Sequence, residues 1–155
     1  MSQGPEAGQH LQALSQQLQE LDQVQAQLQT QLEASRALLQ DVEEAIDALD
    51  ELDTGSTVQV PLGGDAYVRA EIVDIEEVIV DVGADYAVER PRDGAVEILE
   101  EKRDRLETTV DELEENLGEV SADIQQVQGQ AQQLRQQLLQ QQSQQLGGAG
   151  LGENV

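Results

Sequence analysis

The sequence predicts a mainly α protein: two long helices that fold back on each other as an antiparallel coiled coil, joined by two short β-hairpins. Two heptad-patterned segments flank the only β-rich stretch, which lies near the middle of the chain. At 155 residues the chain has room for one ordinary domain. It contains no Phe or Trp, so its apolar surface is mostly Leu, Val, Ile and Ala, which suit coiled coils and small sheets.

The first heptad segment predicts a helix over residues 11–53, preceded by a polar, frayed N-terminus over residues 1–10. Ten of its twelve a and d positions are apolar, which indicates a coiled coil, and Gln25 and Ser35 are the two exceptions. Gly55 suits the position just after a helix end. The twelve positions are Leu11, Leu14, Leu18, Leu21, Gln25, Leu28, Leu32, Ser35, Leu39, Val42, Ile46 and Leu49.

Residues 56–91 predict two hairpins, because alternating apolar residues precede glycine-containing turns at residues 63–65 and 83–85. An isolated hairpin is marginally stable in water. The open edges and apolar faces therefore need a cover, most simply from other subunits, and the sequence predicts an oligomer. The alternating apolar residues are Val58, Val60, Leu62, Val78, Val80 and Val82.

The second heptad segment predicts a helix over residues 93–145, with Asp93 as its N-cap. Residues 146–155 follow as a flexible tail. Of the thirteen seam positions only Arg103 is charged. The seam runs Val96, Leu99, Arg103, Leu106, Val110, Leu113, Leu117, Val120, Ile124, Val127, Ala131, Leu134 and Leu138.

The charge is strongly negative, with 32 acids against 8 bases and a net charge of −24. Such a surface repels nucleic acid and anionic membranes, so neither is expected as a partner. Because molar salt shortens the Debye length to about 3 Å, the composition suits a salt-adapted organism. No apolar run is long enough for a membrane span, and no signal peptide pattern or cysteine occurs, so a cytoplasmic protein is expected.

The negative charge is concentrated in the middle of the chain. Residues 41–120 have a net charge of −20, whereas residues 1–40 and 121–155 together have only −4 and are rich in glutamine. The distal parts of the two helices therefore offer apolar residues on a nearly neutral background. This suits contact with other acidic proteins, although glutamines are also simply good solvated helix formers.

No catalytic, cofactor or metal motif is found, and the sequence predicts a protein that is not an enzyme. The glycine pairs lack the strand–loop–helix setting and the lysine of a phosphate-binding loop. The single His10 has no partners for acid–base chemistry. Neighbouring carboxylates such as Glu43 and Glu44 point apart on a helix and are expected to be solvated.

The hairpin residues resemble those of a known family. The order helix, two hairpins, helix, with VQVPLGG at residues 58–64 and VIVDVGADYAVE at residues 78–89, resembles the alpha-type subunit of archaeal prefoldin, a hexameric co-chaperone. The resemblance covers residues 8–142. Two hairpins indicate the alpha type rather than the beta type, and the acidity suggests a haloarchaeal version.

The resemblance implies a holdase that works without ATP or any cofactor. Two alpha-type and four beta-type subunits would share a β-platform, and the coiled-coil tips would bind non-native proteins for transfer to a group II chaperonin. On this sequence it implies platform residues Val58, Val60, Leu62, Val78, Val80 and Val82. Tip residues in contact with clients would be Leu11, Leu14, Leu18, Leu134, Leu138 and Leu139.

Two other functions are open on the residues alone. The coiled-coil stripes could serve a structural adaptor that binds one dedicated native partner, which would give saturable binding to a single protein. A hydrolase using paired carboxylates would instead show metal- or substrate-dependent turnover. The double hairpin favours the chaperone over the adaptor.

Overall fold

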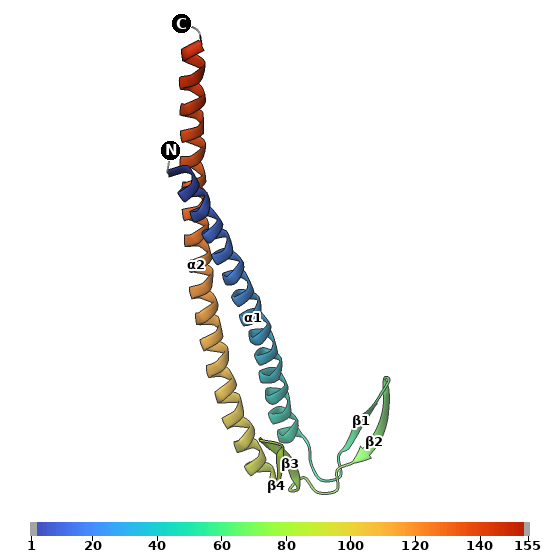
Figure 1. Cartoon of the computed structure of the whole chain (residues 1–155). Helices are drawn as coiled ribbons and strands as arrows, with labels where there is room; N and C mark the ends of the chain where they lie inside the picture. Colours follow the sequence, from blue (N-terminus) through green and yellow to red (C-terminus); the bar gives the residue numbers. More distant parts are fainter. Residues whose placement is uncertain (1–2, 154–155) are drawn as a thin grey trace. The chain divides into compact units, whose positions relative to one another are not determined.

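The chain consists of two long helices with two β-hairpins between them in the sequence (Figure 1). The structure is a computed structural model that describes the backbone of residues 3–153 and the side chains of residues 6–144. Its elements are α1 (Gln3–Glu51), β1 (Thr57–Gly63), β2 (Ala66–Glu71), β3 (Val78–Gly83), β4 (Tyr86–Arg90) and α2 (Arg92–Glu153).

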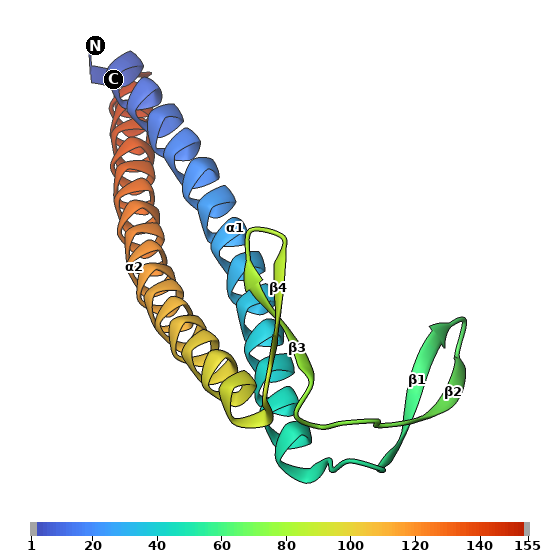
Figure 2. The same ribbon diagram turned by 90° about the horizontal axis from the view of Figure 1, so that it is seen from below.

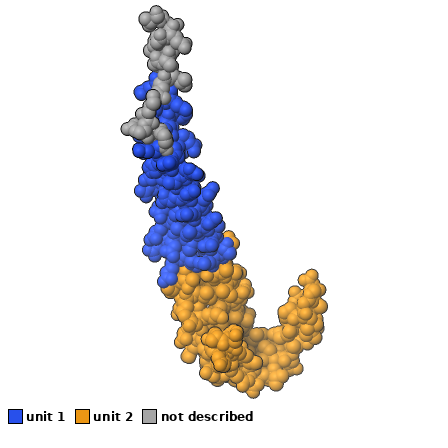
Figure 3. All heavy atoms as spheres, viewed as in Figure 1, with its two compact units in different colours: residues 1–32, 112–155 blue, residues 33–111 orange. Residues whose placement is uncertain are grey.

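The chain divides into two compact units (Figure 3). Unit 1 comprises residues 1–32 and 112–155, and unit 2 comprises residues 33–111. Within each unit a stretch of α1 lies beside a stretch of α2, and the two run in opposite directions (Figures 1 and 2). This arrangement confirms the predicted fold class.

The predicted coiled-coil seam is confirmed position by position. All twenty-five seam residues are buried or half-buried, and most other helical positions are exposed. Leu14 and Leu32 of α1 and Ile124 and Val127 of α2 are among the most buried residues of unit 1. The core is therefore a narrow apolar stripe on each helix, as the heptad pattern requires.

Both helices are longer than the sequence predicts. At about 1.5 Å per residue, the 49 residues of α1 and 62 of α2 extend roughly 74 and 93 Å. α1 begins at Gln3, within the predicted frayed segment, because Pro5 and Glu6 both suit a first helical turn. α2 continues beyond residue 145 to Glu153, since extending a helix is easier than starting one.

Two stretches of those predictions lie outside the described residues. Residues 1–2 belong to the predicted frayed N-terminus, and residues 154–155 belong to the predicted tail. The flexibility of residues 146–155 stays a prediction.

The register of unit 1 is marked by one polar pair in the seam. Gln25 Nε2 donates a hydrogen bond to Ser121 Oγ at 3.3 Å. This pair explains why the heptad pattern tolerates an amide at that point, because a half-buried polar group needs a partner. Polar pairs of this kind select one helix alignment over its neighbours, since a slipped register leaves the amide without its partner.

Each hairpin is a separate two-stranded antiparallel sheet, and the two share the same register. Val60 pairs with Val68 in the first, and Val80 pairs with Val88 in the second. Both ladders shift register just before the turn, at Gly63 and at Gly83. The predicted turns are confirmed at both places.

The two turns also share their backbone conformation. Gly64 and Asp65 have φ of 57° and 62°, and Ala84 and Asp85 have φ of 52° and 62°. Positive φ at both central residues is the geometry of the tight turn that matches strand twist. Ala84 adopts it without being glycine, which costs roughly 1–2 kcal/mol.

The end of α1 and the start of α2 are joined by Arg92. Its guanidinium donates through Nη2 to the backbone oxygen of Leu52 and to Asp53 Oδ1, the latter at 3.1 Å. The sequence places Asp50, Glu51 and Asp53 at the negative end of the α1 dipole, an unfavourable arrangement by itself. Arg92 supplies the positive charge that this helix end lacks within its own sequence.

Candidate functional site

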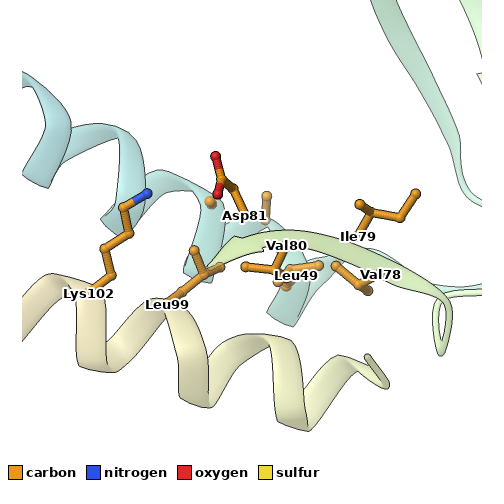
Figure 4. A pocket seen from close by; sticks show the side chains of 9 residues that line it. Leu49, Val78, Ile79, Val80, Asp81, Leu99 and Lys102 are labelled. Atoms are coloured by element: carbon orange, nitrogen blue, oxygen red, sulfur yellow. The ribbon is translucent and has the colours of Figure 1, made fainter. Parts of the chain in front are cut away.

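The second hairpin packs one face against the helices of unit 2. Val80 of β3 is only 6% exposed. Beside it is an apolar pocket of about 350 Å³, with Leu49 of α1 on one side and Leu99 of α2 on the other (Figure 4). Asp81 and Lys102 lie at one end of this pocket, and Ile79 also lines it (Figure 4).

The corresponding face of the first hairpin has no such cover within the described residues. Val60, Leu62 and Val68 are 40%, 68% and 45% exposed. Tyr67, on the neighbouring position of β2, is 60% exposed. This hairpin therefore presents apolar side chains that its own chain leaves in contact with water.

The six predicted platform residues are thus in two different environments. Val78 is half-buried and Val80 is buried, both on the hairpin that packs on its own helices, where Val82 is 48% exposed. Val58 is half-buried, and Val60 and Leu62 are exposed on the other hairpin. The sequence pattern could not predict that Val80 is buried by its own chain, because the pattern is the same in both hairpins.

The six predicted tip leucines all belong to unit 1. Leu14 is 5% exposed and fills the seam, so it could contact another protein only if the helices separated. Leu139, next to the seam, is 60% exposed. The other four, Leu11, Leu18, Leu134 and Leu138, are half-buried.

Leu139 is exposed because it lies outside the seam, and the residues opposite the α2 end of this group are small. Counting from the Gln25–Ser121 pair in opposite directions along the two helices places Leu138 and Leu139 opposite Gly8 and Ala7. Neither residue has a side chain large enough to cover a leucine. The end of α2 is therefore less completely covered than its middle.

A second cavity lies in this part of unit 1. It has a volume of about 310 Å³ and is lined by Leu18 of α1 and four residues of one α2 face, Gln128, Ala131, Gln132 and Arg135. The heptad pattern identifies Leu18 and Ala131 as seam residues, but it does not identify Gln128, Gln132 or Arg135. The charge pattern could have identified Arg135, because it is the only Lys or Arg between Asp123 and Val155.

Neither a metal-binding cluster nor a membrane-spanning helix is found among the described residues. Among those residues, no three His, Cys, Asp or Glu side chains gather where they could hold a metal ion. Within the same residues, no helix combines the length and the apolar character that crossing a membrane requires. The candidate functional surfaces are the exposed first hairpin and the parts of α1 and α2 that belong to unit 1.

Comparisons with known proteins agree with this arrangement. Prefoldin subunit alpha of Haloarcula marismortui is 60% identical over 67 residues, which are 43% of this chain and 44% of that protein. Prefoldin subunit alpha of Halorubrum lacusprofundi is 51% identical over 70 residues, 45% and 46% of the two chains. The matched segment thus spans less than half the length of these relatives.

A solved structure shares the fold. The crystal structure of the prefoldin beta subunit from Thermococcus strain KS-1 superposes with a TM-score of 0.56 at 20% sequence identity. The superposition covers 80% of this chain and 90% of that one. At this identity the likeness shows the fold alone.

The family itself is shown by a broader match. The relatives confirm the predicted resemblance to haloarchaeal alpha-type subunits. The sequence matches the family model described as Prefoldin subunit over residues 10–137. Because that match covers most of its 155 residues, the chain belongs to the prefoldin family.

Proposed function

We propose that this chain is a subunit of an ATP-independent holdase, a hetero-oligomeric co-chaperone of the cytoplasm. Two copies join four beta-type subunits through the hairpins. The complex binds non-native proteins at the distal ends of the helices and passes them to a group II chaperonin. Family membership supports a chaperone subunit rather than an enzyme.

The observation that carries the proposal is the uncovered apolar face of the first hairpin. Its pattern repeats that of the second hairpin, whose face is buried at Val80. An apolar sheet face and open edges left in water favour association with another sheet. A beta-type subunit supplies that sheet, and the chain is incomplete without it.

Client binding is assigned to the distal leucines of unit 1. Leu139 is the most exposed of them, and its surroundings are glutamine-rich and nearly free of charge. An apolar side chain on such a background can bind an unfolded segment without repelling an acidic protein. No nucleotide is needed, because non-covalent contacts with a client form and break without one.

The experiment compares two leucines of similar exposure in the assembled complex. Leu139→Ser removes a proposed client contact, and Leu38→Ser removes a leucine that is 50% exposed but lies in unit 2. In about 2 M KCl both variants are mixed with the beta-type subunit of the same organism, and native mass is measured. Suppression of client aggregation is then compared with wild type.

We expect a hexamer only in the mixtures, and weaker suppression with Leu139→Ser alone. Equal loss in both variants would contradict the assignment to the distal ends. A mass that ignores the beta-type subunit, together with saturable binding to one native protein, would instead establish the dedicated-adaptor function.

A further inference from the structure

The cavity at the distal end of unit 1 combines an apolar floor with a single positive charge. Leu18 and Ala131 are its apolar residues and are both half-buried. Gln128 and Gln132 add amide groups, and Arg135 adds a guanidinium. The four lining residues from α2 are at positions 128, 131, 132 and 135, and this spacing of three and four places them on one helix face.

The surroundings of this cavity contain very few carboxylates for so acidic a protein. α1 has none between Glu6 and Glu20, and α2 has none between Asp123 and Glu153. By the register of the Gln25–Ser121 pair, Arg135 is level with Leu11. Glu6 is then five residues away along the helix axis, or roughly 8 Å, which exceeds the Debye length of about 3 Å in molar salt.

Arg135 is also unengaged in the part of the chain whose side chains the structure describes. Its side chain is exposed, and none of the ion pairs or hydrogen bonds among residues 6–144 involves it. The apolar pocket of unit 2 differs on this point, because there Lys102 is accompanied by Asp81. Of these two cavities in the described part of the chain, the distal one presents a cation without a carboxylate among its lining residues.

We propose that this cavity selects non-native segments in which an apolar side chain is followed closely by a carboxylate. The apolar side chain enters beside Leu18 and Ala131, and the carboxylate binds the Arg135 guanidinium. The amides of Gln128 and Gln132 bind the backbone of the segment. This inference rests on the proposed client-binding function and defines the class of client that the distal end prefers.

The physical basis is a contact ion pair rather than long-range attraction. Molar salt removes steering beyond a few ångströms, but a guanidinium and a carboxylate in direct contact retain their paired hydrogen bonds. A cavity of about 310 Å³ is at the small end of ligand pockets, which suits one side chain rather than a folded partner. An acid-free surface lets an acidic segment approach without repulsion.

The test uses the full complex with beta-type subunits in 2 M KCl and two fluorescently labelled unstructured peptides. Both peptides carry the same leucines and valines; one has Asp or Glu after each of them, and the other has Asn or Gln. Binding is measured by anisotropy for wild type, Arg135→Gln and Arg135→Lys. Arg105→Gln is the matched control, because Arg105 is also an exposed arginine of α2 but belongs to unit 2.

We expect wild type to bind the acidic peptide about three- to fivefold more tightly, the effect of one exposed ion pair. Arg135→Gln removes the preference, Arg135→Lys keeps part of it, and Arg105→Gln leaves it intact. Equal affinities in wild type, or a preference that survives Arg135→Gln, would overturn the inference while leaving the holdase proposal in place. If neither peptide bound wild type, the proposed client-binding function itself would fail.

Discussion

The two hairpins of unit 2 are nearly the same local structure in two different environments. They repeat the same residue pattern twenty positions apart, with the same register, the same register shift before the turn and the same turn conformation. Yet Val80 is 6% exposed, whereas its counterpart Val60 is 40% exposed. The pattern of alternating valines determines that a hairpin forms, and it leaves open what covers the hairpin.

The difference follows from how each hairpin is attached. β4 ends at Arg90 and α2 begins at Arg92, so Pro91 alone separates the second hairpin from a helix. The first hairpin is connected by residues 52–56 to α1 and by residues 72–77 to β3. A one-residue connection holds β3 and β4 near the helices, and the longer connections impose no such constraint on β1 and β2.

The largest expected effect tests whether the first hairpin is covered by other subunits, as the second hairpin is covered by its own helices. The proposed assembly through the first hairpin would bring acid-rich surfaces together, since residues 41–120 have a net charge of −20. Lowering KCl from 2 M to 0.1 M removes the screening of that repulsion. We expect the complex with beta-type subunits to dissociate and the helices to lose part of their circular dichroism signal.

Native mass and circular dichroism over a KCl series measure this effect, and recovery in 2 M KCl is the control for irreversible damage. A mass and a helicity that stayed the same between 0.1 M and 2 M would contradict the electrostatic account.

A smaller effect is expected from the paired substitutions Val80→Ala and Val60→Ala. In the isolated chain, Val80→Ala should lower the free energy of unfolding by about 2 kcal/mol, because it removes buried methyl groups and leaves a cavity. Val60→Ala should change it by less than about 0.5 kcal/mol, as is usual for exposed positions. Urea unfolding in 2 M KCl, followed by circular dichroism, provides both values.

For assembly we expect the opposite order of effects: Val60→Ala should weaken binding to the beta-type subunit more than Val80→Ala does. Equal unfolding free energies for the two variants would mean that the packing of β3 on the helices contributes nothing to stability.

The smallest effect concerns the turns. Ala84→Gly relieves the positive φ of 52° and should raise the free energy of unfolding by about 1 kcal/mol. Gly64→Ala introduces the same strain at a φ of 57°, where an added Cβ meets no other atom within 4 Å. We expect it to weaken amide protection in β1 and β2 while leaving helix unfolding unchanged. Hydrogen exchange in 2 M KCl, read alongside urea unfolding, distinguishes the two responses.

Most of the fold could be predicted because its signals are local. Heptad spacing identifies the seam, and the glycine and aspartate residues at 63–65 and 83–85 identify the turns. Contacts between distant residues were missed: the hydrogen bonds of Arg92 to the end of α1, and the Gln25–Ser121 pair, join positions 40 and 96 residues apart. Val24 and Leu38 directly precede the seam positions Gln25 and Leu39, and they are 42% and 50% exposed because the apolar stripe is narrow.

The candidate surfaces were predictable to a smaller extent. Alternating apolar residues predict the platform positions. This alternation cannot distinguish a hairpin face that the chain's own helices cover from a face that is left free. The tip leucines were chosen by position, and exposure now separates Leu139 from Leu14. Arg135 was missed because a single charge on a glutamine-rich helix becomes notable only beside a cavity.

The tyrosines give the chain a built-in spectroscopic label. It has two aromatic residues in all, Tyr67 in the first hairpin and Tyr86 in the second, and they are 60% and 71% exposed. Near-ultraviolet absorbance and intrinsic emission of this chain therefore come only from the hairpins. Replacing either tyrosine by leucine would leave a chain that reports on one hairpin at a time, with no signal from the helices.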